Sequence, residues 1–149
     1  MIRLPVPAPP VASGGPGPSE MPAAVESGTI LIVDDQPDLA EVLVEELRHD
    51  GHRVEIASTG TEALRRLERR AFDLSVSDTK MPGMDGLELY RELERRFPTL
   101  RHRVIFVTGD VLDADKRRFL RSIGAPMLMK PFDPRAARDL VRRQLATLT

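Results

Sequence analysis

From Thr29 onward, short runs of apolar residues alternate with longer stretches in which apolar residues recur at helical spacing. The short runs are apolar at consecutive positions, which is typical of parallel strands covered on both faces. Five such runs are expected to form strands, over residues 29–33, 53–57, 74–77, 103–107 and 127–129. The pattern therefore predicts an α/β fold, a doubly wound five-stranded parallel sheet with helices on both faces.

The first amphipathic stretch is predicted to be a helix from Pro37 to about Asp50. Proline is tolerated in the first turn of a helix, and Gly51 is a common kind of stop just after the last turn. The buried side of this helix is expected to carry its apolar residues, which are Leu39, Val42, Leu43 and Leu47.

Four further helices are expected after the later strands. Thr59 can cap the second helix, with Glu62 at the spacing of a capping box. The third helix ends before Pro98, and the last two are expected over residues 113–122 and 134–148. The predicted inward-facing residues are Ala63, Leu64 and Leu67, then Leu89, Leu93 and Phe97, then Phe119, Leu120 and Ile123, and finally Ala137, Leu140, Val141 and Leu145.

Residues 1–28 show neither hydrophobic period. Seven prolines interrupt this segment, so it lacks the apolar region that a signal peptide requires. We predict a disordered Pro/Gly-rich tail or linker here, with a docking segment for a partner as the alternative. Residues 29–149 are predicted to be one folded domain.

Charge balance and missing residue types exclude several classes of function. The chain has 22 Lys and Arg against 23 Asp and Glu, so nothing global favours binding to nucleic acid or to an anionic membrane. It has no cysteine, which excludes disulfides and thiolate metal sites and agrees with a cytoplasmic location. No apolar run approaches the roughly 18 residues that a membrane helix requires.

Acidic residues follow two of the predicted strands directly. Asp34 and Asp35 come after the first strand, and Asp78 comes after the third. The carboxyl ends of parallel strands form the edge of the sheet where ligands bind, so these three side chains can meet there. Crowded carboxylates repel one another unless a cation lies between them. Oxygen ligands without nearby histidine or cysteine suit Mg²⁺, so the sequence predicts a magnesium site.

Thr108 and Lys130 follow the fourth and fifth strands and would bring a hydroxyl and an ammonium group to the same edge. Together with Mg²⁺, these groups are suited to phosphoryl transfer, because they neutralise or hydrogen-bond the phosphoryl oxygens. A carboxylate can act as the nucleophile and form an aspartyl phosphate. Because Asp34 and Asp35 can hold a metal together, we expect Asp78 to be that nucleophile.

These motifs resemble, in order, those of the receiver domain of two-component response regulators, and the resemblance covers Thr29 to Leu148. Asp34 and Asp35 match the acidic Mg²⁺ pair of that family, and Asp78 matches its phosphoacceptor. The other matching positions are Thr108 as the hydroxyl switch residue, Lys130 with Pro131 as the lysine motif, and Met81-Pro82 and Asp85-Gly86 as the turn after the phosphoacceptor.

The resemblance implies a flavodoxin-like strand order of 2-1-3-4-5 and a cis peptide bond between Lys130 and Pro131. It also implies that the backbone carbonyl of Lys80 is a further ligand of Mg²⁺. A histidine kinase or a histidine phosphotransfer protein would then supply the phosphoryl group to Asp78. The domain would not be a classical enzyme but would signal by changing a protein-interaction surface.

In this family the fourth helix, fifth strand and fifth helix commonly form a dimer or effector surface, so a homodimer through that face is one expectation. The arginines of the last helix are interpreted as a solvated face or as part of such a dimer face; they are Arg135, Arg138, Arg142 and Arg143. No helix-turn-helix motif is present, so DNA binding is not expected.

Two further expectations concern particular residues. Most receivers have an aromatic residue three positions before the lysine, where this chain has Met127. A flexible thioether side chain predicts a different form of switching, in which the loop after Thr108 moves and the last helical face changes less. The three histidines, His49, His52 and His102, are expected to be solvated rather than metal-binding or phosphodonating.

Three alternatives stand beside the response regulator. The chain begins with Met1 and shows no kinase segment, which favours a stand-alone regulator over the C-terminal receiver of a hybrid sensor kinase. A Mg²⁺-dependent phosphohydrolase would need a second acid two residues after the nucleophile, and Lys80 occupies that place. A nucleotide or flavin protein would need a G-x-G-x-x-G motif after the first strand, which is missing.

Overall fold

The computed structural model describes residues 27–109 and 114–147, and these form a parallel sheet flanked by helices. All four pairs of neighbouring strands are parallel, and the order across the sheet is β2-β1-β3-β4-β5. The predicted fold class and strand order are therefore confirmed. The strands are β1 (Thr29–Val33), β2 (Arg53–Ala57), β3 (Leu74–Asp78), β4 (Val104–Thr108) and β5 (Met127–Met129).

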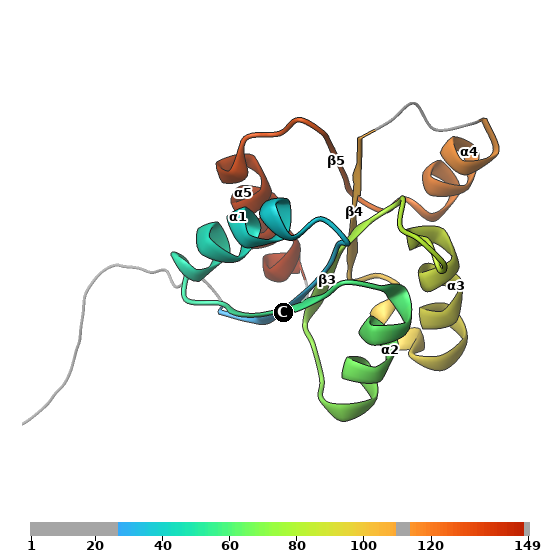
Figure 1. Ribbon diagram of the computed structural model, residues 1–149, viewed down its shortest axis with the longest axis horizontal. Helices are drawn as coiled ribbons and strands as arrows, with labels where there is room; N and C mark the ends of the chain where they lie inside the picture. The colour runs from blue at the N-terminus through green and yellow to red at the C-terminus, as the bar shows by residue number, and fades with distance from the viewer. Residues whose placement is uncertain (1–26, 110–113, 148–149) are drawn as a thin grey trace, which may run out of the picture.

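Each α-helix connects one strand to the next or follows the last strand. Helices α1 and α5 cover one face of the sheet, and α2, α3 and α4 cover the other (Figure 1). A short 3₁₀ helix, η1 (Pro98–Leu100), follows the third helix and was not predicted. The α-helices are α1 (Pro37–Arg48), α2 (Gly60–Arg69), α3 (Gly86–Arg96), α4 (Ala114–Ile123) and α5 (Pro134–Thr147).

Alternating residues of the interior strand β1 supply both halves of the core. Ile30 and Ile32 pack toward α1 and α5, whereas Leu31 and Val33 pack toward α2, α3 and α4. Each of these side chains is at most 1% exposed. Since successive residues of a strand point to opposite faces, this continuous apolar run is what a sheet covered on both sides requires.

The buried side of α1 differs from the prediction at two positions. Leu39 is only half-buried, and Ala40 is buried instead. Val42 is 45% exposed, and Val44 is buried instead. The buried residues occupy positions i, i+3, i+4 and i+7 of one helical face, and they are Ala40, Leu43, Val44 and Leu47. Val42 lies about 100° away from Leu43 around the helix and so turns to solvent.

The N-terminus of α2 also differs in one detail from the predicted capping box. The Thr59 hydroxyl accepts the Glu62 N–H at 3.0 Å, as expected. The Glu62 carboxylate, however, accepts the N–H of Ser58 at 2.9 Å rather than that of Thr59. A complete reciprocal capping box occurs at α3, between Asp85 and Glu88.

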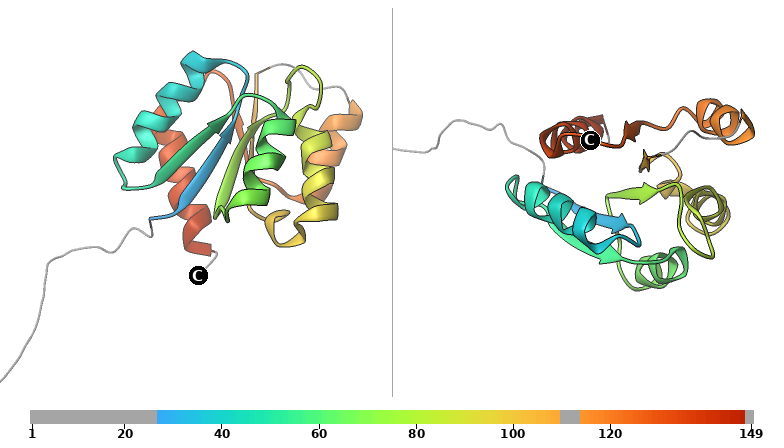
Figure 2. Two further views of the ribbon diagram at one scale, coloured as in Figure 1. Left: turned by 60° about the horizontal axis from the view of Figure 1, so that its bottom comes forward. Right: turned by 45° about the horizontal axis from the view of Figure 1, so that its top comes forward.

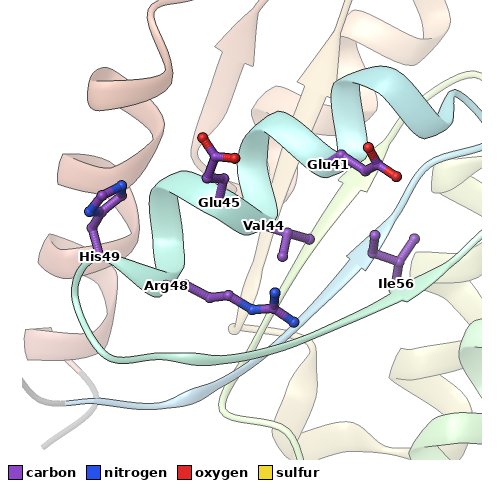
Figure 3. Close-up of a pocket in the computed structure, with 6 residues that line it drawn as sticks. All are labelled: Glu41, Val44, Glu45, Arg48, His49 and Ile56. Atoms are coloured by element: carbon purple, nitrogen blue, oxygen red, sulfur yellow. The ribbon is translucent and has the colours of Figure 1, made fainter.

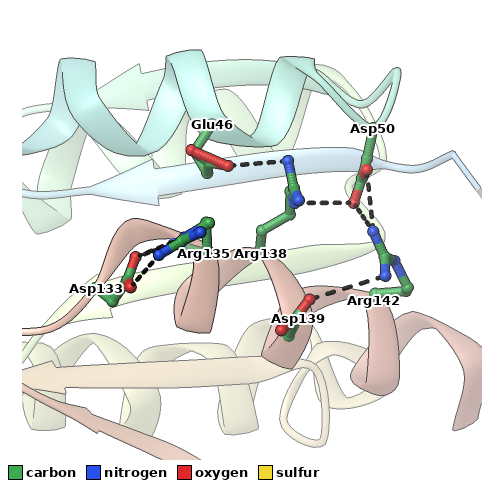
Figure 4. A network of polar contacts seen from close by, with 7 residues as sticks. All are labelled: Glu46, Asp50, Asp133, Arg135, Arg138, Asp139 and Arg142. Carbon is green, nitrogen blue, oxygen red and sulfur yellow. Dashed lines mark hydrogen bonds and ion pairs between the residues drawn. The ribbon is translucent and has the colours of Figure 1, made fainter.

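Ion pairs join the end of α1 to α5 on one face of the sheet (Figure 4). Arg142 donates to the carboxylate of Asp50 at 3.0 Å, and Arg138 contacts the carboxylate of Glu46 at 2.9 Å. The Asp50 and Glu46 side chains are only 10% and 19% exposed. Two of the arginines interpreted as a solvated or dimer face therefore form ion pairs within the molecule, although their side chains stay 26% and 43% exposed. They can do so because α5 lies directly against α1.

His52 is buried, and its predicted solvation is wrong; His49 and His102 are exposed as expected. His52 is 4% exposed, and its Nδ1 accepts the N–H of Gly28 at 3.0 Å. Its Nε2 has no hydrogen-bond partner among the described residues. Burial lowers the pKa of His52, and the nearby charge of Asp50 opposes this only in part. The folded protein therefore holds His52 as a neutral imidazole.

Replacing His52 should make stability less dependent on pH. Below the ordinary value of 6.5 the unfolded chain gains a proton that buried His52 does not accept, so folding loses free energy as the pH falls. In His52→Asn the side-chain oxygen can still accept from Gly28, and nothing titrates. Urea unfolding at about pH 7.5 and about pH 5.5 should show that the free energy of unfolding falls less between these two conditions for this variant than for the wild type.

The exposed neighbour His49 provides the matched control. His49→Asn should keep the pH dependence of the wild type. If lowering the pH destabilises His52→Asn as much as the wild type, His52 is not the group that causes the pH dependence.

Candidate functional site

The strands β1 and β3 lie side by side in the sheet (Figure 2). The three predicted acids meet where these two strands end. Carboxylate oxygens of Asp34, Asp35 and Asp78 lie within 4.8 Å of one another. Asp34 and Asp78 are each only 4% exposed. Because β1 and β3 are parallel neighbours in register, residues at their carboxyl ends are brought side by side.

Burial raises the pKa of Asp34, and the negative charges of Asp78 and Asp35 raise it further. The Gln36 N–H, which donates to Asp34 Oδ1 at 2.9 Å, and the ammonium group of Lys130 oppose this shift without cancelling it. The cluster therefore carries more negative charge than its protein neighbours balance. Carboxylate donors of this kind fit a hard divalent cation such as Mg²⁺.

Each oxygen of Asp78 has a separate hydrogen-bond donor. Oδ1 accepts the backbone N–H of Lys80 at 3.1 Å, and Oδ2 accepts from Lys130 Nζ at 2.9 Å. The Asp78 side chain is 5% exposed and that of Lys130 is 21% exposed, so solvent screens this ion pair only in part. Lys130 thus balances one charge of the acid cluster.

Lys130 reaches the site from directly after β5. Its backbone N–H donates to the carbonyl of Thr108 at 2.8 Å, and the bond between Lys130 and Pro131 is cis, as expected. Its side chain passes close to Gly109, where an added Cβ would lie 2.9 Å from Lys130 Cδ. A larger residue at position 109 would therefore displace the lysine.

Thr108 is the last residue of β4, and β4 pairs directly with β3. It is 1% exposed and lies at the same edge of the sheet as the acids. The predicted hydrogen bond from its hydroxyl to a phosphoryl oxygen stays a prediction, as does the predicted role of the Lys80 carbonyl.

The loop after Asp78 is held close against β3. The N–H of Gly86 donates to the carbonyl of Thr79 at 3.2 Å, and an added Cβ on Gly86 would overlap the carbonyl oxygen of Asp78. Asp85 caps α3 by accepting the Glu88 N–H at 2.9 Å. Gly86 is needed here because it allows this close backbone approach.

A hollow of about 830 Å³ lies at this edge of the sheet. Its lining includes the predicted residues Asp35, Asp78 and Lys130, and also Gln36 and Gly109, which the sequence did not single out. Gln36 occupies the N-cap of α1, where Asn, Asp, Ser and Thr are the favoured residues. An unusual N-cap residue beside the acid pair was the signal that could have identified it.

A second hollow, of about 630 Å³, lies between α1 and β2 (Figure 3). Its lining contains none of the predicted site residues; it consists of Glu41, Val44, Glu45, Arg48, His49 and Ile56. The charged groups here lie on the exposed side of α1, two acidic side chains followed by Arg48 and His49, and do not converge on a point. The hollow at the strand ends is therefore the stronger candidate.

Within residues 27–109 and 114–147, every helix is too short or too polar to cross a membrane. This agrees with the hydropathy of the sequence.

Residues 30–142 match the family model of the response regulator receiver domain. The response regulator protein FleR of Pseudomonas aeruginosa is 38% identical over 114 residues, which cover 76% of this chain and 24% of FleR. The sensor histidine kinase RcsC of Salmonella typhimurium is 34% identical over 117 residues, which cover 78% of this chain and 12% of RcsC. The chain thus spans a quarter or less of the length of these two relatives.

Solved structures show the same relationship. A CheY-like response regulator receiver domain protein from Methanospirillum hungatei superposes with a TM-score of 0.74 at 32% identity, covering 82% of this chain and 96% of that chain. The family match, the sequence relatives and the shared fold agree: this chain belongs to the response regulator receiver domain family.

Proposed function

We propose that this chain receives a phosphoryl group on Asp78 from a phosphohistidine of a histidine kinase or a histidine phosphotransfer protein. The observation that carries the proposal is the buried Asp78 carboxylate, which lies within 4.8 Å of two other acids and 2.9 Å from the Lys130 ammonium. Membership of the receiver family supports this assignment. Histidine kinase partners follow from the same membership.

Asp34, Asp35, Asp78 and the backbone carbonyl of Lys80 would hold Mg²⁺, which supplies charge neutralisation at the phosphoryl oxygens when bound. A carboxylate oxygen of Asp78 forms the new bond to phosphorus, and the bond between phosphorus and the donor imidazole nitrogen breaks. Lys130 stabilises negative charge on the phosphoryl oxygens, and the Thr108 hydroxyl donates a hydrogen bond to one of them.

A receiver domain is a signalling domain, so turnover of a substrate is not its output. The alternative of a Mg²⁺-dependent phosphohydrolase is weaker, because Lys80 lines the hollow at the place where a second acid would be needed. Hydrolysis of a generic phosphomonoester over many turnovers would favour the phosphohydrolase.

The output surface is proposed to lie on α4, β5 and α5, where a homodimer would form. Met127 and Met129 of β5 are 42% and 60% exposed there. Because residue 127 is a methionine and not an aromatic residue, an inward movement of an aromatic ring is not available at this position. We therefore expect phosphorylation to change the face of α5 less than in receivers that have an aromatic residue at this position. The expected movement of the loop after Thr108 concerns residues 110–113, which lie outside the described part of the chain.

The alternative setting is the C-terminal receiver of a hybrid sensor kinase. It is supported by the similarity to RcsC, a sensor histidine kinase, of which this chain matches 12%. In either setting we propose a cytoplasmic location, where a kinase would deliver the phosphoryl group.

Replacing Asp78 tests the central claim. The wild type, incubated with acetyl phosphate and Mg²⁺, should gain the mass of one phosphoryl group in intact mass spectrometry. Asp78→Asn should show no adduct, because an amide is not a nucleophile in this reaction. The exposed residue Asp38 supplies a control, and Asp38→Asn should react as the wild type does. An adduct that persists in Asp78→Asn would refute the assignment.

Removing one charge from the acid cluster should stabilise the metal-free protein. In Asp34→Asn the amide oxygen can still accept the Gln36 N–H, but the repulsion with Asp78 and Asp35 is gone. At neutral pH in EDTA, urea unfolding should show that the free energy of unfolding of Asp34→Asn exceeds that of the wild type by an amount on the order of 1 kcal/mol, a usual size for a single substitution. Because the pKa of Asp34 is raised, lowering the pH toward that pKa protonates Asp34 in the wild type and removes the repulsion there too. The difference in unfolding free energy between the two proteins should therefore shrink.

Added Mg²⁺ should then raise the stability of the wild type more than that of Asp34→Asn, because the variant has one carboxylate fewer. Equal gains in both proteins would contradict a cation site at this cluster.

The homodimer is tested at Met127. Met127→Glu places a charge on the exposed face of β5, so dimerisation of the phosphorylated protein should weaken by about tenfold or more in sedimentation velocity. Val42 is 45% exposed on α1, away from that face, and Val42→Glu serves as the matched control. Equal self-association of the two variants would place the interface elsewhere.

A further inference from the structure

Gln36 stands between the acid pair and α1, and helix capping does not explain its side chain. It occupies the N-cap of α1 but makes no side-chain capping hydrogen bond. Thr59 and Asp85, at the same position of α2 and α3, both cap their helices through the side chain.

The Gln36 side chain reaches Lys130 instead. Lys130 Nζ donates to Gln36 Oε1 at 3.4 Å and to Asp78 Oδ2 at 2.9 Å. These acceptors lie 94 and 52 positions away from Lys130 in the sequence, at the N-cap of α1 and at the end of β3. The ammonium group is therefore held between two elements that flank the site.

The backbone of Gln36 is itself anchored. Its N–H donates to Asp34 Oδ1 at 2.9 Å, and its carbonyl accepts the Ala40 N–H at 3.1 Å. On the other side of the lysine, the close approach of Gly109 limits where the stem of Lys130 can lie. The backbone from which the Gln36 side chain extends is thus held in place beside the acid pair.

The two acceptors respond differently when Asp78 is phosphorylated. A carboxylate that becomes an acyl phosphate loses its own full negative charge, and the charge then lies on the phosphoryl oxygens. Lys130 must then leave Asp78 Oδ2 for those oxygens, whereas the neutral amide of Gln36 is unchanged by the reaction. A long, neutral hydrogen bond can restrain the ammonium group without competing strongly with a phosphoryl oxygen.

We propose that Gln36 is a positioning residue for Lys130, which keeps the ammonium group beside Asp78 in both states and so speeds phosphoryl transfer. This inference rests on the proposed role of Asp78 as the phosphoacceptor. Lys130 keeps all its protons throughout; the only bonds that change are the new one from Asp78 to phosphorus and the broken one to the donor.

Gln36→Met removes the acceptor while keeping the length of the side chain. With acetyl phosphate and Mg²⁺, adduct formation followed by intact mass should slow about fivefold, the effect of losing one modest hydrogen bond. The sequence has one other glutamine, Gln144 in α5, so Gln144→Met is the matched control and should react as the wild type does. Both variants should keep the melting temperature of the wild type.

A second measurement separates positioning from a general structural effect. The chain has three lysines, so ¹⁵N-lysine labelling gives three side-chain nitrogen signals, from Lys80, Lys116 and Lys130. In protein without metal or phosphodonor, Gln36→Met should shift the Lys130 signal and leave the other two in place. Gln144→Met should shift none of them.

The inference is overturned if the Lys130 signal stays in place, or if it moves while the rate is unchanged. A wild type that forms no adduct would refute the phosphoacceptor role and this inference together. If the wild type forms the adduct and Gln36→Met forms it at the same rate, this inference alone is refuted.

Discussion

The site depends on three acids that lie close together, and the ion pair between Lys130 and Asp78 offsets part of the repulsion among them. Asp34 and Asp78 are almost fully buried within 4.8 Å of one another and of Asp35, and buried like charges destabilise a fold unless cations offset them. The ammonium group 2.9 Å from Asp78 offsets one charge, and the donor set suits a divalent cation for the rest. Lys130 can serve in this way because β5 ends at the same edge of the sheet as β3.

The scaffold around this pair is built for close approach. Gly86 lets the loop after β3 pass against the carbonyl of Asp78, and Gly109 leaves room for the stem of Lys130. The capped start of α3 and the ion pairs between α1 and α5 fix the elements on either side. The edge of the sheet is thus held in place by backbone packing, while the charged groups remain available for chemistry.

Much of the fold and the site was predictable from local patterns. Consecutive apolar residues in β1 indicated a strand covered on both faces, and the acids that follow β1 and β3 indicated the site, because strand direction alone decides at which edge they lie. The predictions that failed include the burial of Leu39 and Val42, the complete capping box at Thr59 and the solvation of His52. A shift of one residue in helical phase exposes Val42, and the buried His52 accepts a hydrogen bond from Gly28, which lies 24 positions away in the sequence.

The sequence by itself determined the strand–helix alternation and which residue types stand at each strand end, since both follow from short-range periodicity. Only the tertiary structure decided which of these groups touch. The contacts of Lys130 with Asp78 and Gln36, and of Arg142 with Asp50, join residues that are 52 to 94 positions apart. Such contacts depend on the packing of whole elements against the sheet, and the spacing of residues along one element does not encode them.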